Sequence, residues 1–232
     1  MKKNQFLNIF IAATVLASGC QSNFFKSKPT LFANYYVRYS QDGTRTRAEV
    51  GFFEGDSVRT AEPKAFSSVF FQQGAMNPKR ISARTLRYEA ENSADYPNTF
   101  SFRYKRENSK SEEEKQDLTM SALREFAAEN GVVSKTKGVK LSWKDDALAE
   151  GEGLILLFSD RNGATAEVAL SGPTSATEAS VGVGNRLQNF AEGEGGKLAL
   201  VKKQIRRGQE SKKQWVTQIE FYTKTIAVTI VE

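Results

Sequence analysis

Three pairs of acidic residues in this chain of 232 residues are close enough in sequence to support catalysis by carboxyl groups. They are Asp145 and Asp146, Glu150 and Glu152, and Glu192 and Glu194. A glycosidase needs two carboxyl groups that face one cleft about 5 to 10 Å apart, one of them with a raised pKa. The glutamate pairs lie in expected turns, where charged side chains are usually solvated. We therefore interpret these carboxylates as solvated turn residues. A carboxylate-dependent glycan hydrolase remains a minor alternative.

Histidine is absent from the sequence, and the single cysteine is Cys20. Without histidine, the chain lacks the residues for a Ser-His-Asp or Cys-His catalytic site and for a usual zinc site. Carboxylate chemistry and a serine–lysine pair remain. The acidic loops also lack the alternating Asp and Asn ligands, with a distal Glu, of a calcium-binding loop. We therefore expect a non-enzymatic protein with no metal and no cofactor.

Six cationic side chains within twelve residues form the most basic segment of the chain, and Glu210 alone opposes them. They are Lys202, Lys203, Arg206, Arg207, Lys212 and Lys213. The segment predicts a hairpin that turns at Gly208-Gln209. These cations could contact anionic lipid head groups, lipopolysaccharide phosphates or an acidic partner. Lysines along an exposed strand also discourage edge-to-edge aggregation, and we favour this structural interpretation over a binding patch.

Aromatic doublets are a second candidate binding feature in the N-terminal half. Neighbouring residues on a strand point to opposite faces, so one member of Tyr35-Tyr36 and one of Phe52-Phe53 could be exposed. An exposed aromatic row could bind a glycan or a partner protein. Burial on both faces of the strand explains the doublets equally well.

The first twenty residues have the pattern of a secretion signal. Lys2 and Lys3 precede an apolar run from Phe6 to Leu16, which is too short for a membrane span. The run is followed by Ala17-Ser18-Gly19-Cys20, which resembles the lipobox of bacterial lipoproteins, with alanine at a position where leucine is usual. The resemblance implies that Ala17, Ser18 and Gly19 are recognised by the signal peptidase. It also implies that Cys20 carries diacylglycerol and becomes the acylated N-terminus.

The resemblance also implies a location. Gln21 follows the cysteine in place of the aspartate that resembles an inner-membrane retention signal, which favours the outer membrane. Residues 21–28 contain no acid, which favours the periplasmic side over the cell surface. The formal net charge of +6 falls by two when Lys2 and Lys3 are removed, an excess too small to predict nucleic-acid binding. The expected partners are the membrane, through the lipid anchor, and an envelope protein or a glycan.

The mature chain is expected to be all-β. Residues 20–31 follow the 1–19 signal as a polar tether. In the N-terminal segment, residues 35–53 predict a hairpin around Asp42-Gly43. Residues 86–90 and 100–105 alternate and predict a second antiparallel pair, with a turn at 95–98. The polar stretch 106–117 marks the best domain boundary.

The C-terminal segment shows the same short-strand pattern. Residues 154–158 and 164–170 predict a central hairpin, and 215–221 and 226–230 predict the last strands. Between Ser111 and Asn130 helix and strand signals compete, with a short helix slightly favoured. We therefore expect an immunoglobulin-like β-sandwich over 118–232, preceded by a smaller N-terminal β-domain, or extra strands, over 32–110.

These expectations combine into one leading hypothesis. The protein is expected to be a lipid-anchored, non-enzymatic binding or assembly module of a bacterial envelope, facing the periplasm from the outer membrane. The alternative is a surface carbohydrate-binding lipoprotein that uses an aromatic strand face.

Overall fold

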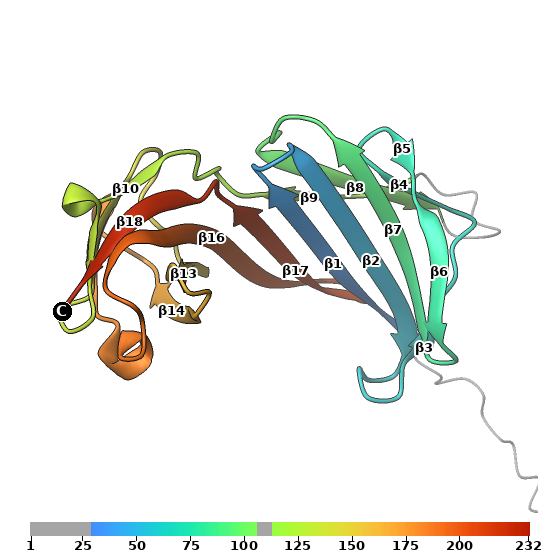
Figure 1. The fold of residues 1–232 in the computed structure, drawn as a ribbon. Coiled ribbons are helices and arrows are strands. Elements are labelled where there is room, and N and C mark those ends of the chain that lie inside the picture. Colours follow the sequence, from blue (N-terminus) through green and yellow to red (C-terminus); the bar gives the residue numbers. More distant parts are fainter. Residues whose placement is uncertain (1–28, 106–112) are drawn as a thin grey trace, which may run out of the picture.

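The computed structural model describes residues 29–105 and 113–232, and these residues form three β-sheets (Figure 1). The prediction of an all-β protein is confirmed, and the immunoglobulin-like arrangement of the C-terminal half stays a prediction. Two short 3-10 turns, η2 (Glu129–Gly131) and η3 (Gly184–Leu187), interrupt the strands. In the described part of the chain, no helix has the length and apolar character to cross a membrane.

The largest sheet takes strands from both ends of the sequence. Its members are β1 (Thr30–Ser40), β2 (Arg45–Gly55), β3 (Glu62–Pro63), β6 (Asn77–Ser82), β7 (Thr85–Ser93), β11 (Val132–Ser134), β13 (Glu152–Ser159), β14 (Thr165–Ser171), β16 (Gly193–Glu210), β17 (Lys213–Tyr222) and β18 (Ile226–Val231). The four-stranded sheet contains β4 (Ser68–Phe71), β5 (Gly74–Ala75), β8 (Thr99–Lys105) and β9 (Glu114–Thr119). The three-stranded sheet contains β10 (Phe126–Ala128), β12 (Val139–Trp143) and β15 (Glu178–Val181).

The hairpin predicted over residues 35–53 is confirmed as β1 and β2, which pair antiparallel along their whole lengths. Gly43 adopts a φ of 82° in the connecting turn, a conformation that favours glycine. Alternation places Tyr35 and Phe52 in the core, where the Phe52 ring contacts Tyr35 and Tyr104. Tyr36 and Phe53 therefore project from the opposite face, which we call the outer face of the large sheet, and both are half-buried there.

The predicted antiparallel pair of residues 86–90 and 100–105 is wrong. β7 pairs with β2 and β6 in the large sheet, whereas β8 pairs with β4 and β9 in the four-stranded sheet. Residues 94–98 carry the chain from one sheet to the facing one. Each strand has one apolar face. That face can be buried whether the two strands pair in one sheet or lie in two sheets that pack face to face. Periodicity alone does not distinguish these two arrangements.

The described part of the segment with competing signals contains the strands β9 and β10, an irregular stretch over 120–125 and the start of η2. β9 pairs with β8, and β10 pairs with β12, so residues 113–130 contain no α-helix. Leu118, Met120 and Leu123 are buried in the core. Pairing with the edge of β8 provides hydrogen-bond partners for the backbone N–H and C=O groups of β9. This tertiary contact outweighs the weak helical pattern.

β16 connects the two halves of the molecule (Figure 1). It pairs with β13 and β18 on its N-terminal side and with β17 on its C-terminal side. β17 in turn pairs in parallel with β1 over ten residue pairs, from Leu31 opposite Lys213 to Ser40 opposite Tyr222. The C-terminal segment thus contributes a strand beside the first strand of the chain, and segments 32–110 and 118–232 share one sheet.

The hairpins of the C-terminal segment follow the sequence pattern in part. The predicted hairpin of 154–158 and 164–170 is confirmed as β13 and β14. The basic hairpin is also present, but its turn lies at residues 211–212 and not at Gly208-Gln209. Gly208 is paired with Trp215, and a Cβ atom on Gly208 would lie 2.2 Å from Cζ2 of the indole. Glycine is needed at this position for close packing and not for a turn.

Candidate functional site

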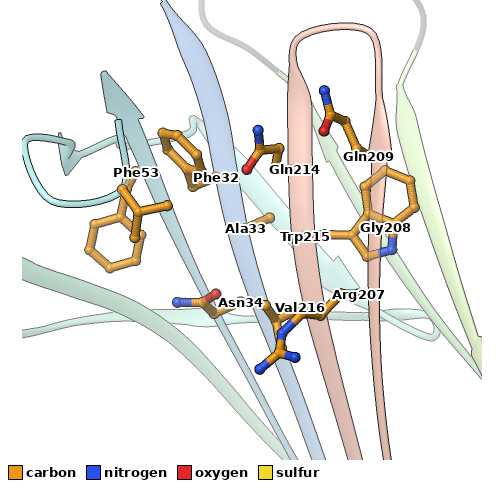
Figure 2. A pocket seen from close by; sticks show the side chains of 11 residues that line it. Phe32, Ala33, Asn34, Phe53, Arg207, Gly208, Gln209, Gln214, Trp215 and Val216 are labelled. Carbon is orange, nitrogen blue, oxygen red and sulfur yellow. The ribbon is translucent and has the colours of Figure 1, made fainter. Parts of the chain in front are cut away.

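A cavity of about 600 Å³ lies at the end of the large sheet where β1 begins and the β16–β17 hairpin turns (Figure 2). This volume falls within the range of small-molecule sites, about 300–1,000 Å³. Its lining residues are Phe32, Ala33, Asn34, Phe53, Val58, Arg207, Gly208, Gln209, Gln214, Trp215 and Val216. They come from four adjacent strands and from the loop after β2.

The register of the strands explains why these side chains meet. Two rows of paired residues cross the outer face from β16 to β2. One row is Gln209, Gln214, Phe32 and Phe53, and the next is Arg207, Val216, Asn34 and Gly51. Ala33, Gly208 and Trp215 alternate with these residues, so their side chains project from the opposite face. The main chain at these three positions forms the floor of the cavity.

Val58 closes one side of the cavity from the loop of residues 56–61. This side chain is 72% exposed although it is apolar. The loop is fixed below it, because the Thr60 amide donates to the Ser57 carbonyl (3.2 Å) and β3 returns to pair with the end of β2. Val58 is therefore presented by a short, anchored loop.

The polar lining residues give the cavity a positive character. Arg207 is the only charged residue among those that line it, and Asn34, Gln209 and Gln214 supply amide groups. Arg207 is exposed, and among the described residues it makes no ion pair. An anionic group at this position would gain a partner without displacing an existing carboxylate.

A second hollow of about 320 Å³ continues along the outer face and shares Asn34, Phe53 and Val216 with the first. The charged residues in its wall already form ion pairs with one another, because Arg87 and Arg47 lie 2.6 and 2.7 Å from the carboxylate of Glu49. Further along, Tyr36 Oη donates to Glu220 Oε2 at 2.8 Å. Burial and this carboxylate raise the pKa of Tyr36. The apolar end of the face is thus open, whereas the polar end is occupied by internal contacts.

The lipobox residues Ala17, Ser18, Gly19 and Cys20 lie outside the described residues. Of the six predicted cations, Lys202 is 1% exposed, and Lys203 lies 3.6 Å from Glu220. Lys213 lies 3.8 Å from Glu114. Arg206, Arg207 and Lys212 are exposed. Strand alternation separates Lys203 and Arg207 from Lys202 and Arg206, so the six cations do not form one patch.

Lys202 instead belongs to a buried polar cluster. Its ammonium lies 3.1 Å from the Glu152 carboxylate and donates to Ser121 Oγ at 2.8 Å. Glu152 also accepts from Gln204 Nε2 and from the amide of Ala149. The interpretation of Glu152 as a solvated turn residue is wrong, because β13 begins at this residue and alternation turns its side chain inward.

The cluster brings together the serine and lysine that sequence analysis left as an alternative chemistry. A lysine that activates a serine must accept its proton. Here Lys202 is the donor to Ser121 and is salt-bridged to Glu152. The arrangement fits a structural network in which Glu152 holds both Lys202 and Gln204.

The other acidic pairs lie on the surface. Asp145, Asp146, Glu150, Glu192 and Glu194 are exposed, and Glu192 is salt-bridged to Lys135 at 3.0 Å. Within residues 29–105 and 113–232, no group of three or more Asp, Glu, His or Cys residues is arranged to hold a metal ion.

Comparison with protein-family models and with curated proteins finds no match. Among solved structures, the chain aligns with the adhesin InvE of Yersinia pseudotuberculosis at 8% sequence identity and a TM-score of 0.24. The alignment covers 82% of this chain and 58% of the adhesin chain.

Sequence analysis missed Phe32, Val58 and Val216 as cavity residues. Phe32 lies in β1, which begins five residues before the predicted hairpin does, at Thr30. Leu31, Phe32 and Ala33 are consecutive apolar residues and all three are buried, so no apolar–polar alternation marks Phe32 as an outer-face residue. The position of Val216 beside Phe32 depends on the pairing of β1 with β17, for which the sequence carries no local signal, whereas Val58 follows β2 of the β1–β2 hairpin.

Proposed function

We propose that this protein is a lipid-anchored, non-enzymatic binding module of a bacterial envelope, and that the outer-face cavity is its binding site. The observation that carries the proposal is an open cavity of about 600 Å³ in which Phe32, Phe53, Val58 and Val216 form apolar walls. Large apolar cavities with a few convergent polar groups are the usual form of a binding site.

The position of the cavity fits the proposed anchor. Nine residues separate Cys20 from Thr30, the first residue of β1. Even fully extended, they span about 35 Å. The cavity begins at Phe32, so a lipid on Cys20 would hold this end of the sheet near the membrane, on the periplasmic face of the outer membrane in our proposal.

A non-enzymatic role is supported by the positions of the side chains that could act as acids, bases or nucleophiles. The cavity lining contains no carboxylate, serine, cysteine or histidine, and the Ser121–Lys202 pair is neutralised by Glu152. The described groups that could act as acids or bases are thus outside the cavity or paired with one another.

The glycan-binding alternative gains less support. It requires an exposed aromatic platform, but the guanidinium of Arg38 covers the Tyr222 ring at 4.1 Å from its centroid. The hydroxyls of Tyr36 and Tyr222 both donate to Glu220, at 2.8 and 3.1 Å. The polar aromatic residues of the outer face are therefore already engaged.

Metabolic labelling tests the anchor. Cells expressing the protein are grown with a palmitate analogue, and the wild type is compared with Cys20→Ala. Label in the wild type alone, with protection from protease added to intact cells, is the expected result. Unlabelled wild-type protein would overturn the proposed anchoring, and protease sensitivity would move the protein to the cell surface.

Site-specific photo-crosslinking in cells tests the cavity. A photo-reactive amino acid replaces Val58, at the cavity, or Ile81, which is also apolar and 50% exposed but lies on β6. A discrete adduct from position 58 that is absent from position 81 is expected. Val216→Trp, which fills the cavity, should remove the adduct. Equal adducts from both positions would contradict a binding site at the cavity.

A further inference from the structure

We propose that the cavity binds the acyl chain of an amphiphile whose anionic head group lies against Arg207. This inference rests on the proposed function, because it assigns a ligand class to the same cavity.

The walls define the chain-binding part. Phe32, Phe53 and Val58 lie at the end of the sheet, beyond the row that contains Arg207. Val58 presents an apolar side chain that is 72% exposed and that a ligand chain would cover. Removal of this apolar surface from water favours a hydrocarbon ligand.

The next row defines the head-group part. Arg207, Val216 and Asn34 cross the sheet side by side, and Gln209 and Gln214 flank them toward the end of the sheet. This set provides one cation and three amide groups. No carboxylate lines the cavity, and Arg207 makes no ion pair in the described part of the chain. A cationic or neutral head group would leave Arg207 without a charged partner.

The two rows give the ligand a direction. The head group lies at Arg207, and the chain runs past Val216 and Phe32 to the Val58 loop. That loop lies at the end where β1 begins, and the Leu31 amide is fixed to the Lys212 carbonyl at 2.8 Å. With an anchor on Cys20, the chain of the ligand would point to the bilayer. A membrane phospholipid and a free fatty acid share this chemistry.

Photo-labelling of the full, anchored protein tests the proposal. The protein is reconstituted in phosphatidylcholine vesicles that contain one of three photo-reactive probes. The first is a fatty acid, the second is a phosphatidylglycerol with the same acyl chain, and the third is an alkylamine of the same length. Labelled residues are then located by mass spectrometry.

We expect an anionic probe to label the peptides that contain Phe32, Val58 or Val216. Labelling by the fatty acid alone identifies a free acid as the ligand class, and labelling by phosphatidylglycerol identifies a bilayer lipid. Labelling by the alkylamine should be about fivefold weaker, as for loss of an exposed ion pair. Equal labelling by all three probes, or label confined to residues outside the cavity, would overturn the proposal.

Two matched pairs of variants sharpen the test. Arg207→Gln should lower labelling about fivefold, whereas Arg206→Gln, on the opposite face of the same strand, should leave it unchanged. Val216→Trp should lower cavity labelling at least tenfold, whereas Val58→Ala should lower it less. If Arg206→Gln and Arg207→Gln have the same effect, the head-group assignment is wrong.

Failure of the lipid-ligand proposal can be distinguished from failure of the proposed function. A protein adduct from position 58 in cells, without lipid labelling of the cavity, would leave the binding module intact and overturn the ligand class. Absence of both signals would overturn both.

Discussion

The ammonium of Lys202 lies 3.1 Å from the carboxylate of Glu152, and the two side chains are 1% and 5% exposed. Lys202 comes from the middle of β16, which connects the two halves of the molecule, and Glu152 begins β13. From the sequence, Glu152 is expected to be a solvated turn residue. The ion pair therefore joins adjacent strands inside the core, next to Ser121.

Removal of one charge from this pair should destabilise the fold. Lys202→Met leaves Glu152 buried without its partner, and we expect a loss of about 3–5 kcal/mol in the free energy of unfolding. Urea denaturation measures the effect. Lys203→Met, on the outer face, should cost less than about 1 kcal/mol. The double variant Lys202→Met with Glu152→Leu should recover part of the loss, and strict additivity would show that the two residues are not coupled.

Close packing of Trp215 on Gly208 predicts a second stability effect. Gly208→Ala places a Cβ atom 2.2 Å from the indole, which must then move. We expect a loss of about 1–3 kcal/mol, measured by urea denaturation. Gly182→Ala is the control, because a Cβ atom there meets nothing within 4 Å. A neutral Gly208→Ala variant would contradict the packing.

The Phe52-Phe53 doublet should separate stability from binding. Phe52 is fully buried among aromatic rings, so Phe52→Ala should cost about 3–5 kcal/mol. Phe53 is half-buried at the cavity, so Phe53→Ala should cost less than half as much and still reduce labelling of the cavity. Thermal unfolding and photo-labelling of the same samples provide the comparison. Equal losses of stability would mean that the two faces are equally packed.

Asp160 predicts a dependence of stability on pH. Its carboxylate accepts hydrogen bonds from the amides of Ala191, Ala164 and Asn162, each at 2.8 Å, and these donors lower its pKa. The pKa is lower in the folded state, so the stabilisation is present above the unfolded pKa of about 3.9. It is lost as the pH falls through the folded pKa.

Asp160→Asn tests this dependence, because the amide group presents N–H to one of the three donors. The difference in unfolding free energy between the wild type and the variant should be constant near neutral pH and decrease below about pH 4. Asp146→Asn is an exposed control that should show a smaller difference. If the difference in unfolding free energy between the wild type and Asp160→Asn increased on acidification, the pKa of Asp160 would not be lowered in the folded state.

Local sequence signals were sufficient for the all-β class and for two hairpins between neighbouring strands. Asp42-Gly43 between alternating segments was sufficient for β1 and β2, and residues 154–170 were sufficient for β13 and β14, because a short turn leaves adjacent strands few other partners. The absence of histidine and the resemblance to a lipobox likewise needed no tertiary information, and they support the proposed class of protein.

Tertiary structure alone decided which distant strands meet. The apolar faces of β7 and β8 are compatible with pairing or with facing one another, and the fold selects the second arrangement. The parallel pairing of β1 with β17 joins residues more than 180 positions apart and places Phe32 beside Val216 and Arg207. The pairing of β16 with β13 brings Lys202 beside Glu152 in the core, whereas Arg207, which belongs to the same basic segment, is exposed. Hydrophobic periodicity fixes which face of a strand is buried, but the partner of that face depends on packing summed over the whole chain.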